Sequence, residues 1–121
     1  MRAVMVIPGR MPGLNEYVRA ERANRYMASS MKKQQTERVG IAAVEQGMPE
    51  FPGRVEIAFT WVEENRRRDM DNVAFAKKFI LDGLVRAGVI RDDTPRYVAG
   101  LSDRFAYDKQ NPRIEVEVRS A

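Results

Sequence analysis

The chain has 121 residues, enough for one hydrophobic core, so we expect a single domain over residues 1–121 with one functional site. Apolar residues make up 44% and charged residues 31%, which is typical of globular proteins, and the net charge of +4 fits a polyanionic partner without requiring one. The sequence has no cysteine and no histidine, which excludes disulfides, thiolate nucleophiles, Ser-His-Asp hydrolysis and zinc sites of the usual kind.

The first residues predict a short strand from Ala3 to Ile7, which Pro8 and Gly9 end because proline lacks a backbone donor and glycine loosens the chain. This apolar stretch is too short for the core of a secretion signal. No segment approaches the roughly 18 apolar residues needed to cross a bilayer. We therefore expect a cytoplasmic protein with no membrane contact.

From Asn15 to about Gln46 the chain is rich in helix-forming residues, and we interpret Asn15 as the N-cap. Ser29-Ser30 and Gly40 suggest a break or bend, so this segment predicts one long helix or two shorter ones. A strand is predicted from Arg54 to Val62, where alternation places four apolar residues on one face: Val55, Ile57, Phe59 and Trp61.

A second helical segment is predicted from Asp71 to Ala87, followed by a turn from Gly88 to Pro95. Two more alternating segments predict strands on either side of the turn-forming residues Asp108 to Pro112: Tyr97/Ala99/Leu101/Phe105 and Ile114/Val116/Val118. The order of elements is β-α-β-α-β-β, which indicates an α+β fold with helices packed on a mixed sheet.

The segment from Asp71 to Ala87 has two different faces if about 100° is allowed per residue. One face carries an apolar stripe that we expect to pack on the sheet: Val73, Ala76, Ile80, Leu84 and Ala87. Lys78 and Asp82 lie opposite, within about 20° of Asp71. Because apolar residues flank this polar row, we expect Lys78 and Asp82 to be partly buried, either as a structural ion pair or as part of a site.

Two aspartates, Asp69 and Asp71, stand one residue apart, so in extended backbone both side chains point the same way. Neighbouring carboxylates repel each other unless a cation or a shared proton compensates, and Mg²⁺ prefers oxygen ligands of this kind. Such an ion can activate water and stabilise charge on a phosphodiester. The preceding Arg66-Arg67-Arg68 suits phosphate binding, and Asp92-Asp93 offers further oxygen ligands.

Each of these motifs also has an ordinary structural explanation. Asp71 is a good helix N-cap residue, and Asp69 suits a solvated turn. Asp92-Asp93 before Thr94-Pro95 is a turn signal. The arginines fit a solvated basic turn.

Three separated motifs occur in the order that is typical of one nuclease family. They are Arg67-Arg68-Asp69-Met70-Asp71-Asn72, Lys78 with Asp82-Gly83-Leu84, and Ala87-Gly88-Val89-Ile90-Arg91-Asp92-Asp93. Together with Pro12-Gly13-Leu14-Asn15-Glu16-Tyr17 after the first strand, they make the chain resemble the RusA family of Holliday junction resolvases, which are found in bacteria, phages and prophages.

The resemblance implies a RusA-like fold and a homodimeric endonuclease that hydrolyses phosphodiester bonds in branched DNA, namely four-way junctions, during recombination, repair or phage DNA processing. It implies a Mg²⁺ cofactor, for which Mn²⁺ can substitute, in a bacterial or phage-infected cell. The implied catalytic residues are Asp69, Asp71, Asp93 and Lys78, and the three aspartates would also bind the metal. Further candidates are Asp92 as a metal ligand, Arg66, Arg67, Arg68 and Lys77 as DNA-binding residues, and Asn72 and Asn15 as supporting residues.

The lysine departs from the commonest pattern of that family, in which it follows the second aspartate by four residues. Here Lys77 and Lys78 stand six and seven residues after Asp71, as if Ala74-Phe75-Ala76 had been inserted. Lys78 keeps the family spacing to Asp82, whereas Lys77 points about 120° away from the Asp71 face. Lys78 is therefore the predicted catalytic lysine, with a reach lengthened by about 4.5 Å along a continuous helix.

Two other functions fit the same residues. A branched-DNA-binding protein without catalysis would bind DNA in a salt-sensitive manner and would not cut it, whichever divalent metal is added. A structural or interaction domain, whose aspartates only cap and turn, would keep the same thermal stability when Mg²⁺ is added.

Overall fold

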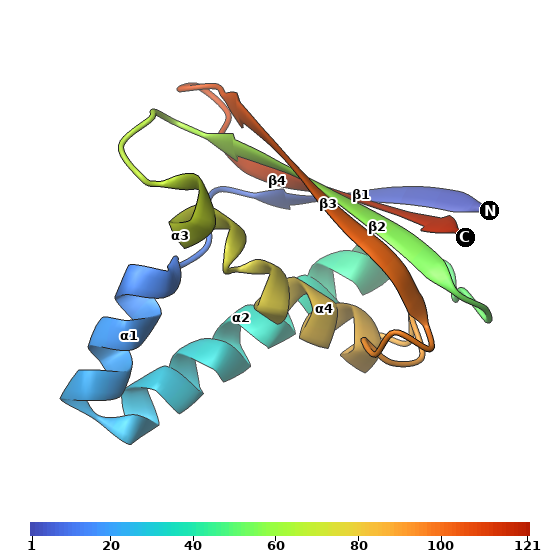
Figure 1. Ribbon diagram of the computed structural model, residues 1–121, viewed down its shortest axis with the longest axis horizontal. Coiled ribbons are helices and arrows are strands. Elements are labelled where there is room, and N and C mark those ends of the chain that lie inside the picture. Colours follow the sequence, from blue (N-terminus) through green and yellow to red (C-terminus); the bar gives the residue numbers. More distant parts are fainter.

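The computed structural model describes residues 1–121 and shows one four-stranded sheet with helices packed on one of its two faces (Figure 1). The strands are β1 (Arg2–Pro8), β2 (Val55–Glu63), β3 (Val98–Tyr107) and β4 (Arg113–Ser120). The helices are α1 (Leu14–Ala23), α2 (Arg25–Glu45), α3 (Met70–Ala74) and α4 (Lys77–Arg86). The predicted α+β fold and its order of elements are confirmed, and each of the two predicted helical segments is divided in two. None of the helices combines the length and apolar character needed to span a membrane.

The sheet is mixed, as predicted. Its strand order is β1-β4-β2-β3, with β4 antiparallel to both β1 and β2 and β3 parallel to β2. The strands β1 and β3 are therefore the two edges. The opposite face of the sheet is not covered by any helix (Figure 1).

Strand β2 carries the centre of the core. The alternating residues predicted to share a face are all at most 1% exposed: Val55, Ile57, Phe59 and Trp61. They pack with the apolar stripe of the later helices, in which Val73, Ala76, Ile80 and Leu84 are at most 3% exposed. Burial of this stripe against the sheet is the main force that orients α3 and α4.

The alternation predicted for the third strand is wrong at Ala99 and Leu101, which are both exposed. Strand β3 is an edge strand, so it has a neighbour on one side only. A register shift also separates the pair Val55–Val98 from the pair Glu56–Gly100, which leaves Ala99 as an extra residue. The regular alternation in the sequence is therefore not translated into one buried face.

The first helical segment breaks at Asn24, rather than at Ser29-Ser30 or Gly40. Asn24 has φ −170° and ψ 129°, and its side-chain oxygen accepts a hydrogen bond of 2.8 Å from the backbone N–H of Tyr26. This is the geometry of a helix N-cap, so α2 starts anew after α1 ends. Asn15 is not an N-cap, because Gly13 occupies that position of α1.

The second segment breaks between Ala74 and Lys77 and is not one continuous helix. At this point the backbone N–H groups of Ala76, Lys78 and Phe79 each bond to the carbonyl three residues earlier. Such bonds tighten the turn and interrupt the regular helical rotation. Asp71 and Lys78 consequently belong to different helices, and the polar row expected from a straight helix holds only for Lys78 and Asp82.

Helices α2 and α4 cross at unusually close range. A Cβ atom built on Gly83 would lie 2.5 Å from two side-chain atoms of Val39. Only a residue without a side chain allows this approach. The crossing brings the middle of α2 next to the polar side of α4, where Lys78 and Asp82 lie.

Candidate active site

Asp69 and Asp71 lie at the start of α3, after the loop that leaves β2. Asp69 occupies the N-cap position with φ −65° and ψ 150°, yet its side chain makes no capping hydrogen bond. Asp71 lies in the first turn, and both residues are exposed. Neither carboxylate forms a hydrogen bond or ion pair with another protein group. The capping and turn explanations therefore leave the oxygen atoms of both carboxylates unused.

The backbone before these aspartates is held by Arg68. Its Nε and Nη2 donate to the two carboxylate oxygens of Glu63 at 2.8 and 2.9 Å, and its Nη1 donates to the carbonyl of Met11 at 3.0 Å. The side chains of Arg68 and Glu63 are only 15% and 13% exposed. In the free protein the Arg68 guanidinium is thus occupied by protein partners, which distinguishes it from the other two arginines of the triplet.

The backbone after the aspartates is held by Asn72, which is 9% exposed. Its side-chain oxygen accepts a hydrogen bond of 2.8 Å from the backbone N–H of Asn15 in the first turn of α1. Gly13 lies so close that an added Cβ would stand 2.6 Å from that oxygen. The two supporting candidates, Asn72 and Asn15, therefore join the loop after β1 to the aspartate segment, Asn15 through its backbone.

Lys78 forms a second cluster on α4. Its Nζ lies 3.0 Å from Asp82 Oδ1 and 3.4 Å from Asp93 Oδ2, and Asp82 Oδ2 also lies 3.9 Å from Nζ of Lys32 on α2. The hydrogen bond to Asp82 is the main cause that raises the pKa of Lys78 above its usual value, with a further contribution from Asp93. Asp82 is 21% exposed, but Lys78 is 52% exposed, so the predicted partial burial applies to the aspartate and much less to the lysine.

The two adjacent aspartates after α4 have different roles. The Oδ1 of Asp92 accepts a hydrogen bond of 2.8 Å from the backbone N–H of Asp93, which is the local turn contact expected of an aspartate there. The side chain of Asp93 instead reaches Lys78. The geometry thus gives a reason, independent of any resemblance, to prefer Asp93 over Asp92 as a site residue.

Lys77 is tied to the sheet. Its Nζ lies 2.6 Å from Asp103 Oδ2 on β3, and the other oxygen of Asp103 accepts a hydrogen bond of 2.9 Å from Trp61 Nε1. The Lys77 ammonium also lies 5.6 Å from the centre of the Phe59 ring. These contacts attach the first turn of α4 to β2 and β3, and they leave Lys77 less available to DNA than the sequence suggested.

Arg66 and Arg67 are the exposed members of the arginine triplet. The guanidinium of Arg66 lies 4.7 Å from the centre of the Tyr107 ring, and the side chain of Arg67 has no partner in the protein. Both positive charges are therefore open to an anionic ligand beside the aspartate segment.

Sequence reasoning missed Glu63 and Asp103. Glu63 stands two residues after Trp61, the last of the alternating buried residues of β2, and a turn separates it from Arg68. An acidic residue and an arginine on either side of a turn are a local signal that could have predicted this ion pair. Asp103 bonds to Lys77 across 26 positions, and no local pattern predicts such a pairing.

The site residues all lie inside one continuous match to a known family. A family model described as Endodeoxyribonuclease RusA matches residues 8–119. The chain belongs to the RusA endodeoxyribonuclease family. The match begins at the end of β1 and ends within β4, so it spans Asp69, Asp71, Lys78 and Asp93. No curated protein matches the chain.

This RusA-family chain does not gather its carboxylates into a finished metal site. No three acidic side chains are close enough to one another to hold one cation. Asp93 is engaged with Lys78 rather than with Asp69 and Asp71. The structure thus divides the predicted residues between the unpartnered pair on α3 and the ion-paired cluster on α4.

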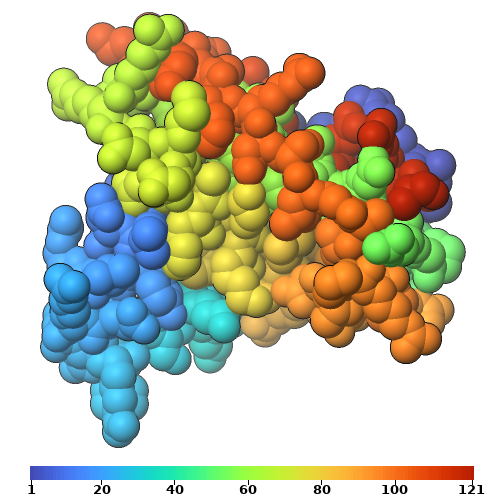
Figure 2. All heavy atoms as spheres, viewed as in Figure 1, coloured from blue at the N-terminus to red at the C-terminus, as the bar shows by residue number.

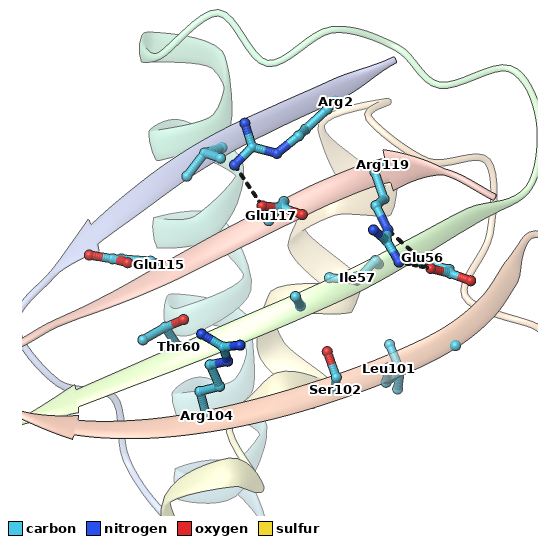
Figure 3. A pocket seen from close by; sticks show the side chains of 13 residues that line it. Arg2, Glu56, Ile57, Thr60, Leu101, Ser102, Arg104, Glu115, Glu117 and Arg119 are labelled. Atoms are coloured by element: carbon cyan, nitrogen blue, oxygen red, sulfur yellow. Dashed lines mark hydrogen bonds and ion pairs between the residues drawn. The ribbon is translucent and has the colours of Figure 1, made fainter.

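A hollow of about 570 Å³ in this RusA-family chain lies elsewhere, on the open face of the sheet (Figure 3). Its charges are largely paired with one another: Arg2 lies 2.8 Å from Glu117, and Arg119 lies 2.5 Å from Glu56. Arg104 is the exception, because it has no ion-pair partner. A surface whose charges neutralise each other offers little attraction to a polyanion, so we assign the chemistry to the helical side.

Proposed function

We propose that this RusA-family chain is a divalent-metal-dependent endonuclease that resolves four-way DNA junctions by phosphodiester hydrolysis. The observation that carries the proposal is the pair of exposed, unpartnered carboxylates of Asp69 and Asp71. Arg68 holds the backbone before this pair, and Asn72 holds the backbone after it. Groups that are held in place but unsatisfied within the protein suit a ligand that arrives from solvent.

The donor set fits Mg²⁺, with Mn²⁺ as a substitute, because carboxylate oxygens are hard ligands and Mg²⁺ usually takes only one or two of them. Asp69, Asp71 and Asp93 would hold the ion, with Asp92 as a further candidate. When bound, the ion supplies an activated water and neutralises charge on the scissile phosphate.

The basic side chains divide into two kinds of role. Lys78 is kept protonated by Asp82 and Asp93, which raise its pKa, and we assign it to the charge on the reacting phosphate. Arg66 and Arg67 are free to contact flanking phosphates. Arg68 positions the aspartate segment through Glu63 and Met11.

The test is the nicking of a synthetic four-way junction in Mg²⁺ or Mn²⁺. We expect the parent chain to cut and Asp71→Asn to lose cutting by several orders of magnitude, because a neutral amide is a poor ligand for a hard cation. Glu64→Gln removes another exposed negative charge nearby and should cut like the parent. Equal cutting by Asp71→Asn and the parent would remove the metal-site assignment.

A second candidate is a branched-DNA-binding protein without cleavage. It is favoured by the ion pairs of Lys78, whose charge is shared between Asp82 and Asp93 before any substrate arrives. This candidate predicts salt-sensitive binding to the junction and no nick in any divalent metal. The first nick observed under any such condition decides against it.

We also propose a homodimer, because a junction presents two equivalent strands that a two-fold assembly can cut symmetrically. Light scattering on the chain bound to a junction should give a stoichiometry of two protein chains per DNA. Paired symmetrical cuts by a complex with one protein chain would contradict this proposal.

A further inference from the structure

The arm formed by α1 and the first part of α2, residues 14–33, concentrates the positive charge of the protein. It contains five basic residues and two acidic ones, a net charge of +3 compared with +4 for the whole chain. One of the acidic residues, Glu16, is paired with Arg10 at 2.9 Å, outside the arm. Arg22 has no ion-pair partner, and neither has Arg25. The arm therefore carries unpaired positive charge that the fold does not use internally.

The arm extends away from the sheet, and the turn between its two helices is the part of the helical layer farthest from β1–β4 (Figures 1 and 2). Near this turn Tyr26 is 67% exposed and Met27 is 55% exposed. Only Ala20 and Ala28 are buried among the residues of the two helices within the arm. Core packing thus explains the base of the arm and leaves its outer part without a structural purpose.

A groove of about 490 Å³ runs between the two helices of the arm. Its charged lining includes Arg22, Arg25 and Lys32, with Ser29 between the last two. Arg25, Ser29 and Lys32 are spaced by four and three residues, which places them on one face of α2. The groove is therefore a basic track along the arm, with a single acidic residue, Glu21, in its lining.

The inner end of this groove meets the Lys78 cluster, because Nζ of Lys32 lies 3.9 Å from Asp82, which in turn bonds to Lys78. Tyr17 of the groove also packs on α3 and α4, with its ring 5.3 Å from that of Phe75 and 6.2 Å from that of Phe79. The arm is thus anchored directly on the two helices that carry the candidate active site.

The spacing of the basic residues suits a nucleic-acid backbone. Lys32 and Arg25 are two helical turns apart, about 10.5 Å. Along the axis of B-DNA each strand carries one phosphate per roughly 3.4 Å, so two side chains this far apart can contact different phosphates of the same backbone. Arg25 Nη2 donates to Tyr26 Oη at 3.0 Å, which holds its guanidinium in place while other N–H groups stay free for phosphate.

We propose that the groove between α1 and α2 binds the sugar–phosphate backbone of one duplex arm of the branched DNA, with Lys32 nearest the cut site and Arg25 and Arg22 farther out. This inference rests on the proposed function, which supplies the DNA. It adds a contact surface beyond the residues of the active site, and it predicts that affinity depends on the length of the DNA arms.

The test compares two double variants that each remove two positive charges. Arg22→Ala/Arg25→Ala acts in the groove, whereas Arg104→Ala/Lys109→Ala removes two exposed charges that form no ion pair, one of them on the open sheet face (Figure 3). Binding to a four-way junction is measured in EDTA over a range of salt concentrations, with long arms and with arms truncated near the branch. Equal thermal unfolding temperatures for parent and variants check that the fold is intact.

On the long-arm junction we expect the groove variant to reduce the slope of log affinity against log salt by about 1.8, which is about 0.9 for each lost phosphate contact. The control pair should keep the slope of the parent, and truncated arms should remove the difference. Equal slopes for the groove variant and the parent would overturn the inference, and so would equal losses in both pairs. An altered oligomeric state with an unchanged slope would identify the groove as a protein interface and would also overturn it.

These outcomes separate the inference from the proposed function. If the groove variant shows the expected slope change but the parent makes no nick, the groove keeps its role and the cleavage activity is excluded. If the parent nicks normally but the variant shows no slope change, only the DNA-binding role of the groove is excluded. A parent that does not bind branched DNA removes both.

Discussion

The crossing of α2 and α4 contains two glycines that should respond oppositely to alanine. A Cβ atom on Gly83 would lie 2.5 Å from two atoms of the Val39 side chain and 3.0 Å from the Thr36 carbonyl oxygen. A Cβ atom on Gly40, in the facing helix, would lie 3.8 Å from the carbonyl oxygen of Gly83, an ordinary contact distance. Both glycines lie inside helices, where alanine is the more favourable residue.

The expected magnitudes follow from these distances. Gly40→Ala should raise the free energy of unfolding by roughly 0.5–1 kcal/mol, the usual difference in helix propensity. At Gly83 the same gain is opposed by overpacking, which typically costs about 1–3 kcal/mol. Because carbon atoms normally approach to about 3.5–4.0 Å, the two helices must separate by on the order of 1 Å. With an overpacking cost near the upper end of that range, less the propensity gain, we expect a net loss of roughly 2 kcal/mol.

Urea unfolding followed by circular dichroism measures both changes, because a shift of the midpoint at constant slope reports stability alone. The parent chain is the reference, and Gly40→Ala is the matched control for the propensity term. A Gly83→Ala variant as stable as Gly40→Ala would show that the helices do not approach this closely in solution. The placement of Lys32 beside Asp82 would then lose its support.

Arg68→Ala should lower the free energy of unfolding by roughly 2–4 kcal/mol, because it leaves the mostly buried carboxylate of Glu63 unpaired, while Arg66→Ala should change it by less than about 0.5 kcal/mol. Chemical denaturation tests this, and similar values for the two variants would contradict the positioning role. The second prediction concerns Lys78, whose pKa is raised above 10.5 mainly by its hydrogen bond to Asp82. Asp82→Asn should lower that pKa towards its usual value, as measured by NMR titration of ¹³C-labelled lysine side chains.

The sign of the associated stability change follows from the direction of the shift. A raised lysine pKa means that the folded state holds the proton more tightly, so the stabilisation is fully present below pH 10.5 and is lost as pH rises through the folded-state pKa. Asp82→Asn should therefore reduce the stability difference between neutral and strongly alkaline pH. An unchanged lysine titration in Asp82→Asn would show that the pair does not persist in solution.

The parts of the fold that could be predicted depend on local contrast between buried and exposed positions. Strand β2 has one face against the helices, so alternation along the chain is sufficient to identify it. The helix breaks could not be predicted in this way. Gly40 and the serine pair are weak helix formers, but packing of α2 outweighs a propensity difference of about 1 kcal/mol or less for each. The actual break at Asn24 occurs where the chain has to reverse direction, which is a requirement of the tertiary structure.

In the candidate site, too, some features follow from local sequence and others depend on contacts between distant parts of the chain. Asp69 and Asp71 are neighbours, so their common exposure follows from local sequence. The contact between Lys78 and Asp93 depends on the path of the chain after α4, which only the family resemblance indicated beforehand. The partners of basic residues were the least predictable. A lysine or arginine in the sequence suggests DNA binding, but its partner in the structure can instead be a distant aspartate of the same chain, as for Lys77.

The interruption between α3 and α4 explains how the chain accommodates the unusual position of its lysine. The helix breaks at Phe75 and Ala76, within the three residues that look inserted relative to the common family pattern. A continuous helix would have moved the lysine about 4.5 Å farther from the aspartates and rotated it by about 60°. The break instead frees α4 to be oriented by its own contacts, with Phe79 packed on Tyr17. Lys78 is therefore held in its cluster by Asp82, one turn along the same helix, and by Asp93, which the chain brings back after α4.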